Sequence, residues 1–295
     1  MALTDSDPED AITKEEIAGT APAPETGAAG VSQGTKRNAF TELMSPKPKI
    51  PKDDNGPSHN PKTLASTRGA LTRSFKERDG LGAYTHDPAA YPPSRVIFHD
   101  DDFVAINDMY PKSTVHTLLL PRSPEHCRLH PFDAFEDAAF LAAVQAATAK
   151  LKRLVAKELQ RRYGPVSAQE REREAVLNGE QDWEEGRELP AGRNWESELL
   201  VGVHAHPSMN DLHVHVLAPD MVSECMRHRK HYNSFHTGFL VDLADFPLPQ
   251  SDGRRHPGKF LQLDLKCWRC GRNFENRFKQ LKEHLADEFE AWKKE

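Results

Sequence analysis

The sequence contains few cysteines and no long apolar run. Its four cysteines among 295 residues are too few for a disulfide-stabilised fold of this size. No stretch approaches the roughly 18 apolar residues that a membrane-spanning helix needs. The first part of the chain also lacks the basic segment followed by an apolar segment that is typical of a secretory signal peptide. We therefore expect a soluble, intracellular protein with no membrane association.

Aromatic residues are almost missing from the first quarter of the chain. Phe40 is the only one before Phe75, and residues 1–69 contain eight prolines. A segment with so little to bury cannot recover its ordering entropy, so these residues are predicted to be a disordered tail. Within it, Phe40, Leu43 and Met44 have helical spacing, which indicates either a short helix that binds a partner protein or a chance pattern. Basic residues flank this segment and are consistent with nuclear import.

The charge balance is mildly acidic, because 39 Lys and Arg residues against 45 Asp and Glu residues give a net charge of -6. This excess does not by itself indicate a protein that binds a polyanion, so the charge has to be considered segment by segment. Hydrophobic residues make up 37% of the chain, which is enough for one sizeable core and a smaller module.

From about residue 70 onwards the apolar residues follow regular patterns. They predict a short helix at 74–79, strands at 96–98, 103–106 and 116–120, a long helix over 132–163, a charged and solvated insertion at 164–194, and strands at 199–203 and 212–217. Strands, a long helix and further strands favour an α+β fold with an antiparallel sheet. We assign residues 70–250 to this domain and residues 251–295 to a second, smaller module.

Histidines gather in the predicted strands. His213 and His215 alternate along one strand and share a face, His204 ends the strand before it, and His116 begins another. Such a set is either a satisfied polar face or a site for phosphoryl or nucleotidyl transfer, in which a neutral ring nitrogen attacks phosphorus. Carboxylates suited to a magnesium pair are not evident beside these histidines. We therefore favour a covalent phosphoramidate route without a catalytic metal.

Several motifs in this region resemble a known family. Residues 211–217 resemble the HxHxHxx signature of the histidine-triad superfamily, and residues 98–116 resemble its nucleotide-binding strand and turn. More narrowly, four separated motifs occur in the same order as in the aprataxin family of DNA 5′-adenylate hydrolases: residues 110–112, 201–209, 230–235 and 265–271. The forkhead-associated domain of animal aprataxins is missing, so we do not carry over their phosphopeptide docking.

The resemblance implies a role for each site residue. His213 would take AMP from an abortive DNA ligation product, and water would then release AMP from the adenylated histidine. His204 would assist departure of the DNA 5′-phosphate, while His215 and Ser208 would hold the transferred phosphate. The further nucleotide- and phosphate-binding residues are His116, Lys112, Asp108 at the ribose, and Phe98, Ile106 and Met109 as walls of the adenosine pocket. The alternative is that these three apolar side chains belong to the ordinary core, which is the commoner fate of such residues.

One position departs from the signature. The first residue of the triad is Asp211 instead of histidine, so a role that needs an imidazole there does not transfer. A carboxylate beside histidines could raise their pKa or orient a ring. Because the nucleophile position, His213, is intact, we expect activity to survive.

The C-terminal module has the spacing of a metal site. Cys267 and Cys270 are separated by two residues, and thirteen residues lie between Cys270 and His284, a pattern typical of structural zinc. The fourth ligand is predicted to be Glu288, one helical turn further on, with Asp287 as the competing residue. We therefore expect a zinc finger whose Zn²⁺ is structural.

The same module is locally basic. Residues 254–282 carry nine Lys and Arg residues against two acidic ones, which indicates salt-sensitive contacts to a polynucleotide backbone. The candidate DNA-binding residues are Arg227, Lys230, His231, Arg269 and Arg272. The resemblance to aprataxins, whose short helix before the first strand is a wedge at a DNA end, implies that Phe75 is such a wedge and stacks on an exposed base pair; a plain core contact is the alternative.

Together these features favour a nuclear DNA 5′-adenylate hydrolase in single-strand break repair. It would act as a monomer on adenylated nicks, including those at RNA–DNA junctions, and release AMP. The first alternative is a histidine-triad hydrolase of small nucleoside phosphoramidates or dinucleotides, which would not require the basic zinc module. The second is a non-catalytic DNA-binding adaptor, with Asp211 as a mark of lost activity.

Overall fold

The computed structural model of the 295-residue chain describes residues 77–184, 186–256 and 258–295. The predicted tail at 1–69, its apolar segment around Phe40 and the candidate wedge Phe75 lie outside the described residues. Of the short helix predicted at 74–79, a 3-10 turn at Glu77–Asp79 lies within them.

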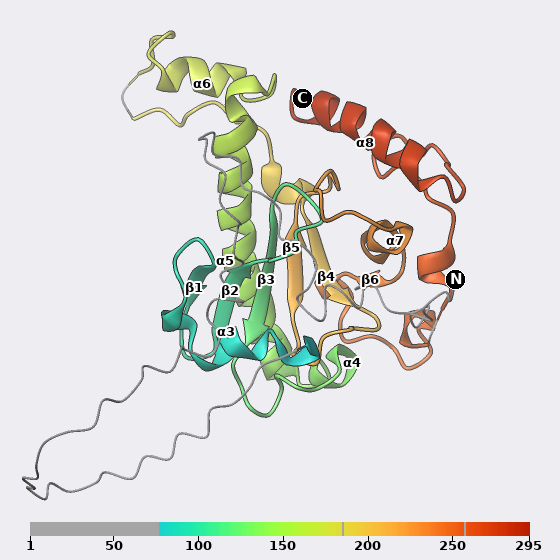
Figure 1. The fold of residues 1–295 in the computed structure, drawn as a ribbon. Coiled ribbons are helices and arrows are strands. Elements are labelled where there is room, and N and C mark those ends of the chain that lie inside the picture. The colour runs from blue at the N-terminus through green and yellow to red at the C-terminus, as the bar shows by residue number, and fades with distance from the viewer. Residues whose placement is uncertain (1–76, 185, 257) are drawn as a thin grey trace, which may run out of the picture. The chain divides into compact units, whose positions relative to one another are not determined.

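The centre of the fold is a six-stranded antiparallel sheet with the order β1-β2-β3-β5-β4-β6 (Figure 1). The strands are β1 Val96–His99, β2 Phe103–Asn107, β3 His116–Pro121, β4 Leu200–His204, β5 Val214–Leu217 and β6 Leu240–Val241. The sheet confirms the predicted α+β antiparallel class. Strand β5 begins at Val214, so His213 lies just before the observed strand and not within it, as the prediction at 212–217 had it. The two-residue strand β6 was not predicted from the sequence.

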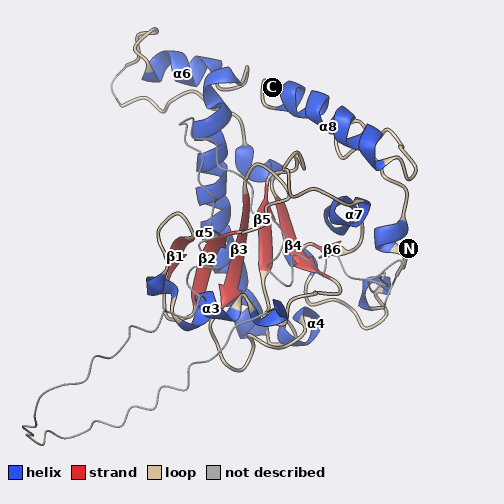
Figure 2. Cartoon of the chain, in the orientation of Figure 1, coloured by secondary structure: helices blue, strands red, loops and turns tan. Residues whose placement is uncertain are grey.

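The helices flank this sheet (Figure 2). They are α3 Gly82–His86, α4 Pro131–Ala134, α5 Ala138–Tyr163, α6 Arg171–Leu177, α7 Arg229–His236 and α8 Phe278–Trp292. Short 3-10 helices lie at Pro88–Ala90, Gly164–Val166, Trp195–Glu198, Leu243–Asp245, Gly253–Arg255 and Phe260–Gln262. No helix within the described ranges is long and apolar enough to cross a membrane.

The long helix predicted over 132–163 is interrupted. Asp137 caps α5, because its carboxylate accepts hydrogen bonds from the backbone N–H groups of Ala139 and Phe140. A capping residue needs a non-helical backbone conformation, which Asp137 has with φ -76° and ψ 106°. The segment therefore forms two helices, and the prediction of one continuous helix was wrong.

The two faces of the sheet have different functions. Val214 and Val216 of β5 pack in the core beneath α5, with Val144 and Leu151 of that helix. Because side chains alternate along a strand, His215 faces the opposite side. The helix α5 thus covers one face with apolar side chains and leaves the other face for the histidines.

The region 164–194 is more than a solvated insertion. Glu170 is fully buried, and its carboxylate accepts hydrogen bonds from the Trp195 indole, the Arg193 backbone N–H and the Gln160 amide. The Arg193 side chain is buried as well, and its guanidinium bonds Glu198 and the backbone carbonyl of Trp292. The prediction of a wholly solvated segment was therefore wrong, because Glu170 and Arg193 are buried and find polar partners in the interior.

The C-terminal segment shares cores with the sheet domain. Trp292 of α8 is buried against Tyr163 and Trp195. A second cluster joins the end of β5, the residues that follow it and α7 to the cysteine-containing segment and α8. Its members are Leu217, Met221, Met226, Tyr232, Phe235, Leu265, Cys267, Phe274, Leu281 and Leu285. Contacts of this kind hold the smaller module against the histidine face.

Candidate active site and zinc site

Four imidazoles meet on the face of the sheet opposite α5. The ring centroids of His204 and His213 lie 4.4 and 4.9 Å from that of His215, and the His116 centroid lies 5.2 Å from it. Phe235 of α7 packs against three of these rings, at 5.0 to 5.3 Å. The four histidines are all buried. The structure thus brings together the histidines that the sequence analysis selected.

Hydrogen bonds define the tautomers of two rings. The backbone N–H of Lys112 donates to His116 Nδ1 over 3.1 Å, so this nitrogen is an acceptor and the ring proton of a neutral His116 is on Nε2. His116 Nε2 lies 2.9 Å from His215 Nδ1 and donates to it. The proton of a neutral His215 is therefore on Nε2, a buried atom without a hydrogen-bond partner among the described residues.

A separate bond orients His213. Its Nδ1 lies 2.8 Å from the backbone carbonyl oxygen of Asp211, and a carbonyl can only accept, so Nδ1 carries the proton. The lone pair of a neutral His213 is then on Nε2, the nitrogen available for attack on phosphorus. Since the backbone of residue 211 makes this bond, the ring keeps its orientation although the side chain there is Asp instead of His.

Three buried polar atoms of the predicted site residues lack a hydrogen-bond partner within the part of the chain that the structure describes. They are Ser208 Oγ, His204 Nε2 and His215 Nε2. Buried polar atoms in proteins are nearly always hydrogen-bonded, and an exception calls for an explanation such as a ligand. Hydroxyl and imidazole N–H groups suit the oxygens of a phosphate.

Burial keeps these rings uncharged. It lowers the pKa of His213 and places those of His204 and His215 well below the usual value. The pKa of His116 falls to about 4, again chiefly through burial, although Asp108 acts in the opposite direction. All four imidazoles are therefore neutral near pH 7, as nucleophilic attack by a ring nitrogen requires.

Two of the predicted nucleotide ligands stand beside His116. The Asp108 carboxylate lies 3.5 Å from His116 Nδ1 and also accepts a hydrogen bond from the Tyr110 backbone N–H. Lys112 is buried next to it. Asp108, His116 and His215 also place donor atoms close enough to surround a cation. His116 Nδ1 already accepts a hydrogen bond from the Lys112 backbone, and His116 Nε2 bonds His215 Nδ1. The metal-free mechanism stays a prediction.

The apolar walls predicted for the adenosine pocket divide between the two faces. Ile106 lies on the histidine face but is only 1% exposed, within a core cluster around Leu118, as the ordinary-core alternative describes. Phe98 packs in the core of the α5 face, with Lys150 Nζ 4.1 Å from its ring centroid. A bulge between Val96 and Phe98 turns the strand, so Phe98 does not join the histidines. Met109 is half-buried, and its role stays a prediction.

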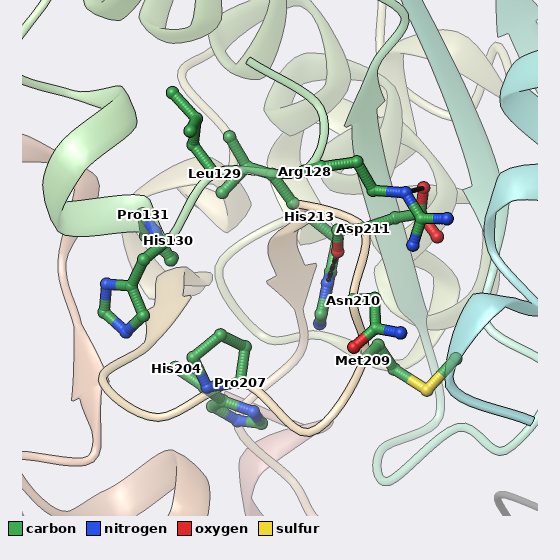
Figure 3. Close-up of a pocket in the computed structure, with 11 residues that line it drawn as sticks. Arg128, Leu129, His130, Pro131, His204, Pro207, Met209, Asn210, Asp211 and His213 are labelled. Atoms are coloured by element: carbon green, nitrogen blue, oxygen red, sulfur yellow. Dashed lines mark hydrogen bonds and ion pairs between the residues drawn. The ribbon is translucent and has the colours of Figure 1, made fainter. Parts of the chain in front are cut away.

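A cavity of about 220 Å³ opens beside the histidines (Figure 3). Its lining residues are Arg128, Leu129, His130, Pro131, His204, Pro207, Met209, Asn210, Asp211, Leu212 and His213. The segment 128–131 was not predicted to be part of the site. A tertiary contact brings it to the residues before β5, because the Leu212 backbone N–H donates to the carbonyl of the adjoining Cys127 over 2.8 Å. No local sequence pattern signals such a contact.

The predicted zinc ligands converge in the C-terminal module. One donor atom from each of Cys267, Cys270, His284 and Glu288 lies within 4.8 Å of the other three. His284 Nε2 is 3.1 Å from both Cys270 Sγ and Glu288 Oε1. Two thiolates, an imidazole and a carboxylate are suitable ligands for zinc. Glu288, and not Asp287, completes this cluster.

The candidate DNA-binding residues have unequal surroundings. His231 is fully buried, and its Nδ1 contacts the Cys225 carbonyl and the Arg227 backbone N–H, so a direct surface contact of His231 with DNA is not possible in this structure. Arg269 pairs with Glu288 and Glu295, whereas exposed Arg272 lies 4.9 Å above the Phe274 ring. Arg227 is exposed and Lys230 half-buried; the DNA contacts of these exposed and half-buried residues stay predictions.

Comparisons with known proteins agree with this geometry. A HIT domain model matches residues 90–222, and a model of the C2HE / C2H2 / C2HC zinc-binding finger matches residues 236–291. The aprataxin-like protein of Schizosaccharomyces pombe is 34% identical over 73% of this chain and 82% of its own length. The corresponding protein of Saccharomyces cerevisiae is 31% identical over 72% of this chain and 96% of its own.

Solved structures show the same likeness. A crystal structure of the aprataxin ortholog Hnt3 in complex with DNA is 32% identical to this chain, with a TM-score of 0.56, and covers 73% of this chain and 96% of the Hnt3 chain. A second structure, Hnt3 in complex with DNA and guanosine, has the same identity, TM-score and coverage. The matching domains, the extent of the aligned sequence and the convergent histidines lead to one conclusion: this chain belongs to the aprataxin family.

Proposed function

We propose that the protein removes AMP from 5′-adenylated DNA ends through a covalent adenylyl-histidine. The observation that carries this proposal is the bond from His213 Nδ1 to the Asp211 carbonyl, because it leaves the Nε2 lone pair for attack on phosphorus. The buried polar atoms Ser208 Oγ, His204 Nε2 and His215 Nε2 have no hydrogen-bond partner among the described residues, and we propose that they bind the phosphate oxygens.

The first step exchanges one bond at the phosphorus of AMP. His213 Nε2 attacks it, and the bond to the bridging oxygen of the DNA 5′-phosphate breaks, so the electron pair leaves with the DNA. Ser208 Oγ–H and His215 Nε2–H donate to the non-bridging oxygens, where charge concentrates in the transition state. His204 assists the departing phosphate.

The second step restores the histidine. A water molecule attacks the same phosphorus and the P–N bond breaks, so the electron pair of that bond returns to His213 Nε2. The water oxygen stays on AMP, one of its protons passes to solvent, and His213 regains its neutral form. On the nucleotide side, Asp108 would hold the ribose hydroxyls and Lys112 the phosphate. The low pKa values of the buried rings keep the nucleophile unprotonated at neutral pH.

The polynucleotide is the proposed partner because of the zinc module and the solved relatives. The Hnt3 structures contain DNA, and Arg272 of the module and Arg227, just before α7, are exposed basic residues. Zinc would fold the module by joining its four ligands. We further propose that the protein acts as a monomer in the nucleus, in single-strand break repair, on nicks that include RNA–DNA junctions.

The test is a nicked duplex that carries a 5′-AMP group, incubated with purified protein without added divalent metal. We expect AMP release by the wild type and, after rapid denaturation at alkaline pH, AMP attached to His213 by mass spectrometry. His213→Ala should abolish release but retain DNA binding. The matched control is His99→Ala, an exposed histidine at the end of β1. AMP release that persists in His213→Ala would refute the mechanism.

The same experiment separates the alternatives. A hydrolase of small nucleoside phosphoramidates would cleave those compounds and leave adenylated DNA intact. A DNA-binding adaptor would retain nick binding and release no AMP from either substrate.

A further inference from the structure

The cavity beside His213 has a charged wall formed by Arg128 and Asp211 (Figure 3). Both residues line it together with His204, the group assigned to the departing phosphate. The ribose ligand Asp108 is not among the described residues that line this cavity. The cavity therefore corresponds to the leaving-group side of the site and not to the adenosine side.

Arg128 is held at the cavity by two carboxylates, and one nitrogen of its guanidinium has no hydrogen-bond partner among the described residues. Its Nε lies 3.7 Å from Asp211 Oδ1, and its Nη1 donates to Asp79. Its Nη2 makes no hydrogen bond or ion pair with any residue in the described ranges. The side chain is 39% exposed, so the remaining N–H groups are accessible to a ligand in the cavity.

The charge of Asp211 makes a nearby cation necessary. Its carboxylate is buried, with an exposed side-chain fraction of 4%, next to the place where two linked phosphates would bind. The histidines cannot offset that charge, because burial keeps them neutral. A carboxylate facing a polyanion in a poorly solvated site is strongly unfavourable.

We propose that Arg128 and Asp211 act as a pair in which Arg128 binds the DNA 5′-phosphate as it leaves and so selects substrates with a phosphate leaving group. The pair takes the place of the first histidine of the HxHxHxx signature. This inference rests on the proposed adenylate hydrolysis. It assigns to Arg128 a contact with the departing phosphate and thereby a part in leaving-group specificity.

The chemistry of the first step explains the selectivity. As the bond from the AMP phosphorus to the bridging oxygen breaks, the DNA 5′-phosphate gains one negative charge. A guanidinium presents paired N–H donors that match two phosphate oxygens and stabilises that charge. Adenosine 5′-phosphoramidate loses ammonia at the same step, so it develops no such anion and gains nothing from Arg128.

The experiment compares two substrates in one variant. Arg128→Gln should lower kcat/KM for the adenylated nick roughly 10- to 100-fold, the loss expected for a hydrogen bond to a charged group, and change that for adenosine 5′-phosphoramidate less than about 3-fold. Arg161→Gln is the matched control, because Arg161 is an exposed arginine that pairs with Glu158 on α5. Thermal unfolding of each variant checks that the fold is retained.

The pairing is tested by a second substitution. Arg128→Gln combined with Asp211→Asn should recover at least half of the logarithmic loss, because the negative charge of Asp211 beside the bound phosphates is then gone. Equal losses on both substrates would show that Arg128 is merely structural, and no loss on either, or strictly additive effects, would also overturn the proposal. Failure of adenylate hydrolysis itself would appear in the wild type before any variant is compared.

Discussion

Substitution of Arg269 should weaken zinc binding although Arg269 is not a ligand. The two oxygens of Glu288 have different partners, since Oε1 lies 3.1 Å from His284 Nε2 on the ligand side and Oε2 accepts a 2.6 Å bond from Arg269 Nη1. The arginine therefore fixes the direction in which Glu288 presents its ligand oxygen. Outer-shell partners of this kind orient metal ligands and hold them deprotonated, and Arg269 indeed lowers the pKa of Glu288.

The magnitude follows from the type of bond and its exposure. A hydrogen bond between charged groups contributes about 1.5 to 3 kcal/mol, and the Arg269 side chain is 28% exposed, so the lower part of that range applies. A loss of about 1.5 to 2 kcal/mol corresponds to roughly a 10- to 30-fold larger zinc dissociation constant. We expect this change for Arg269→Gln.

The assay is competition for zinc against a chromophoric chelator, with cobalt absorption as a second measure of ligand geometry. Arg272→Gln is the matched control, because Arg272 contacts the Phe274 ring and, among the described residues, forms no ion pair with a carboxylate. Arg272→Gln should leave zinc affinity unchanged and weaken DNA binding. If Arg269→Gln and wild type compete equally for zinc, the reasoning about the second oxygen of Glu288 is refuted.

Three further measurements test the fold and the histidine site. Trp292→Ala should lower the free energy of unfolding by about 3 to 5 kcal/mol in urea titrations, because it removes a fully buried aromatic ring. The unfolded chain binds protons more readily than buried His116, whose pKa is about 4. Stability should therefore fall by about 3 kcal/mol from this group as the pH drops from about 6.5 to 4, and His116→Asn should flatten that part of the profile. Gly202→Ala should destabilise the β4–β6 edge and raise amide exchange there, because the added Cβ would lie 2.3 Å from the Val241 carbonyl oxygen.

Site features formed by residues that are close together in the chain could be predicted from the sequence. The alternation of His213 and His215 follows from strand geometry. The zinc cluster follows from a two-residue gap between thiols and one helical turn between His284 and Glu288. In each case the residues that must meet are close in the chain, or their element fixes the direction of their side chains.

Features that depend on tertiary contacts or backbone irregularities could not be predicted in this way. A bulge in β1 places Phe98 on the α5 face of the sheet. No residue type in that strand indicates the bulge. Arg128 meets Asp211 across separate segments, and Glu170 is buried because Trp195 and Arg193 supply its hydrogen bonds. From the sequence alone a charged residue is predicted to be exposed to solvent, because its buried partners are not known.

The zinc module also supports the histidine site through one helix. Tyr232 of α7 donates a 2.7 Å hydrogen bond to the Lys266 carbonyl and accepts a 2.9 Å bond from the Trp268 backbone N–H, on either side of the ligand Cys267. Three residues further along the same helix, Phe235 packs on the imidazole rings. A catalytic group functions only when its surroundings hold it within a narrow range of positions. The metal ligands therefore determine where α7 lies, and α7 in turn limits the positions open to the histidines.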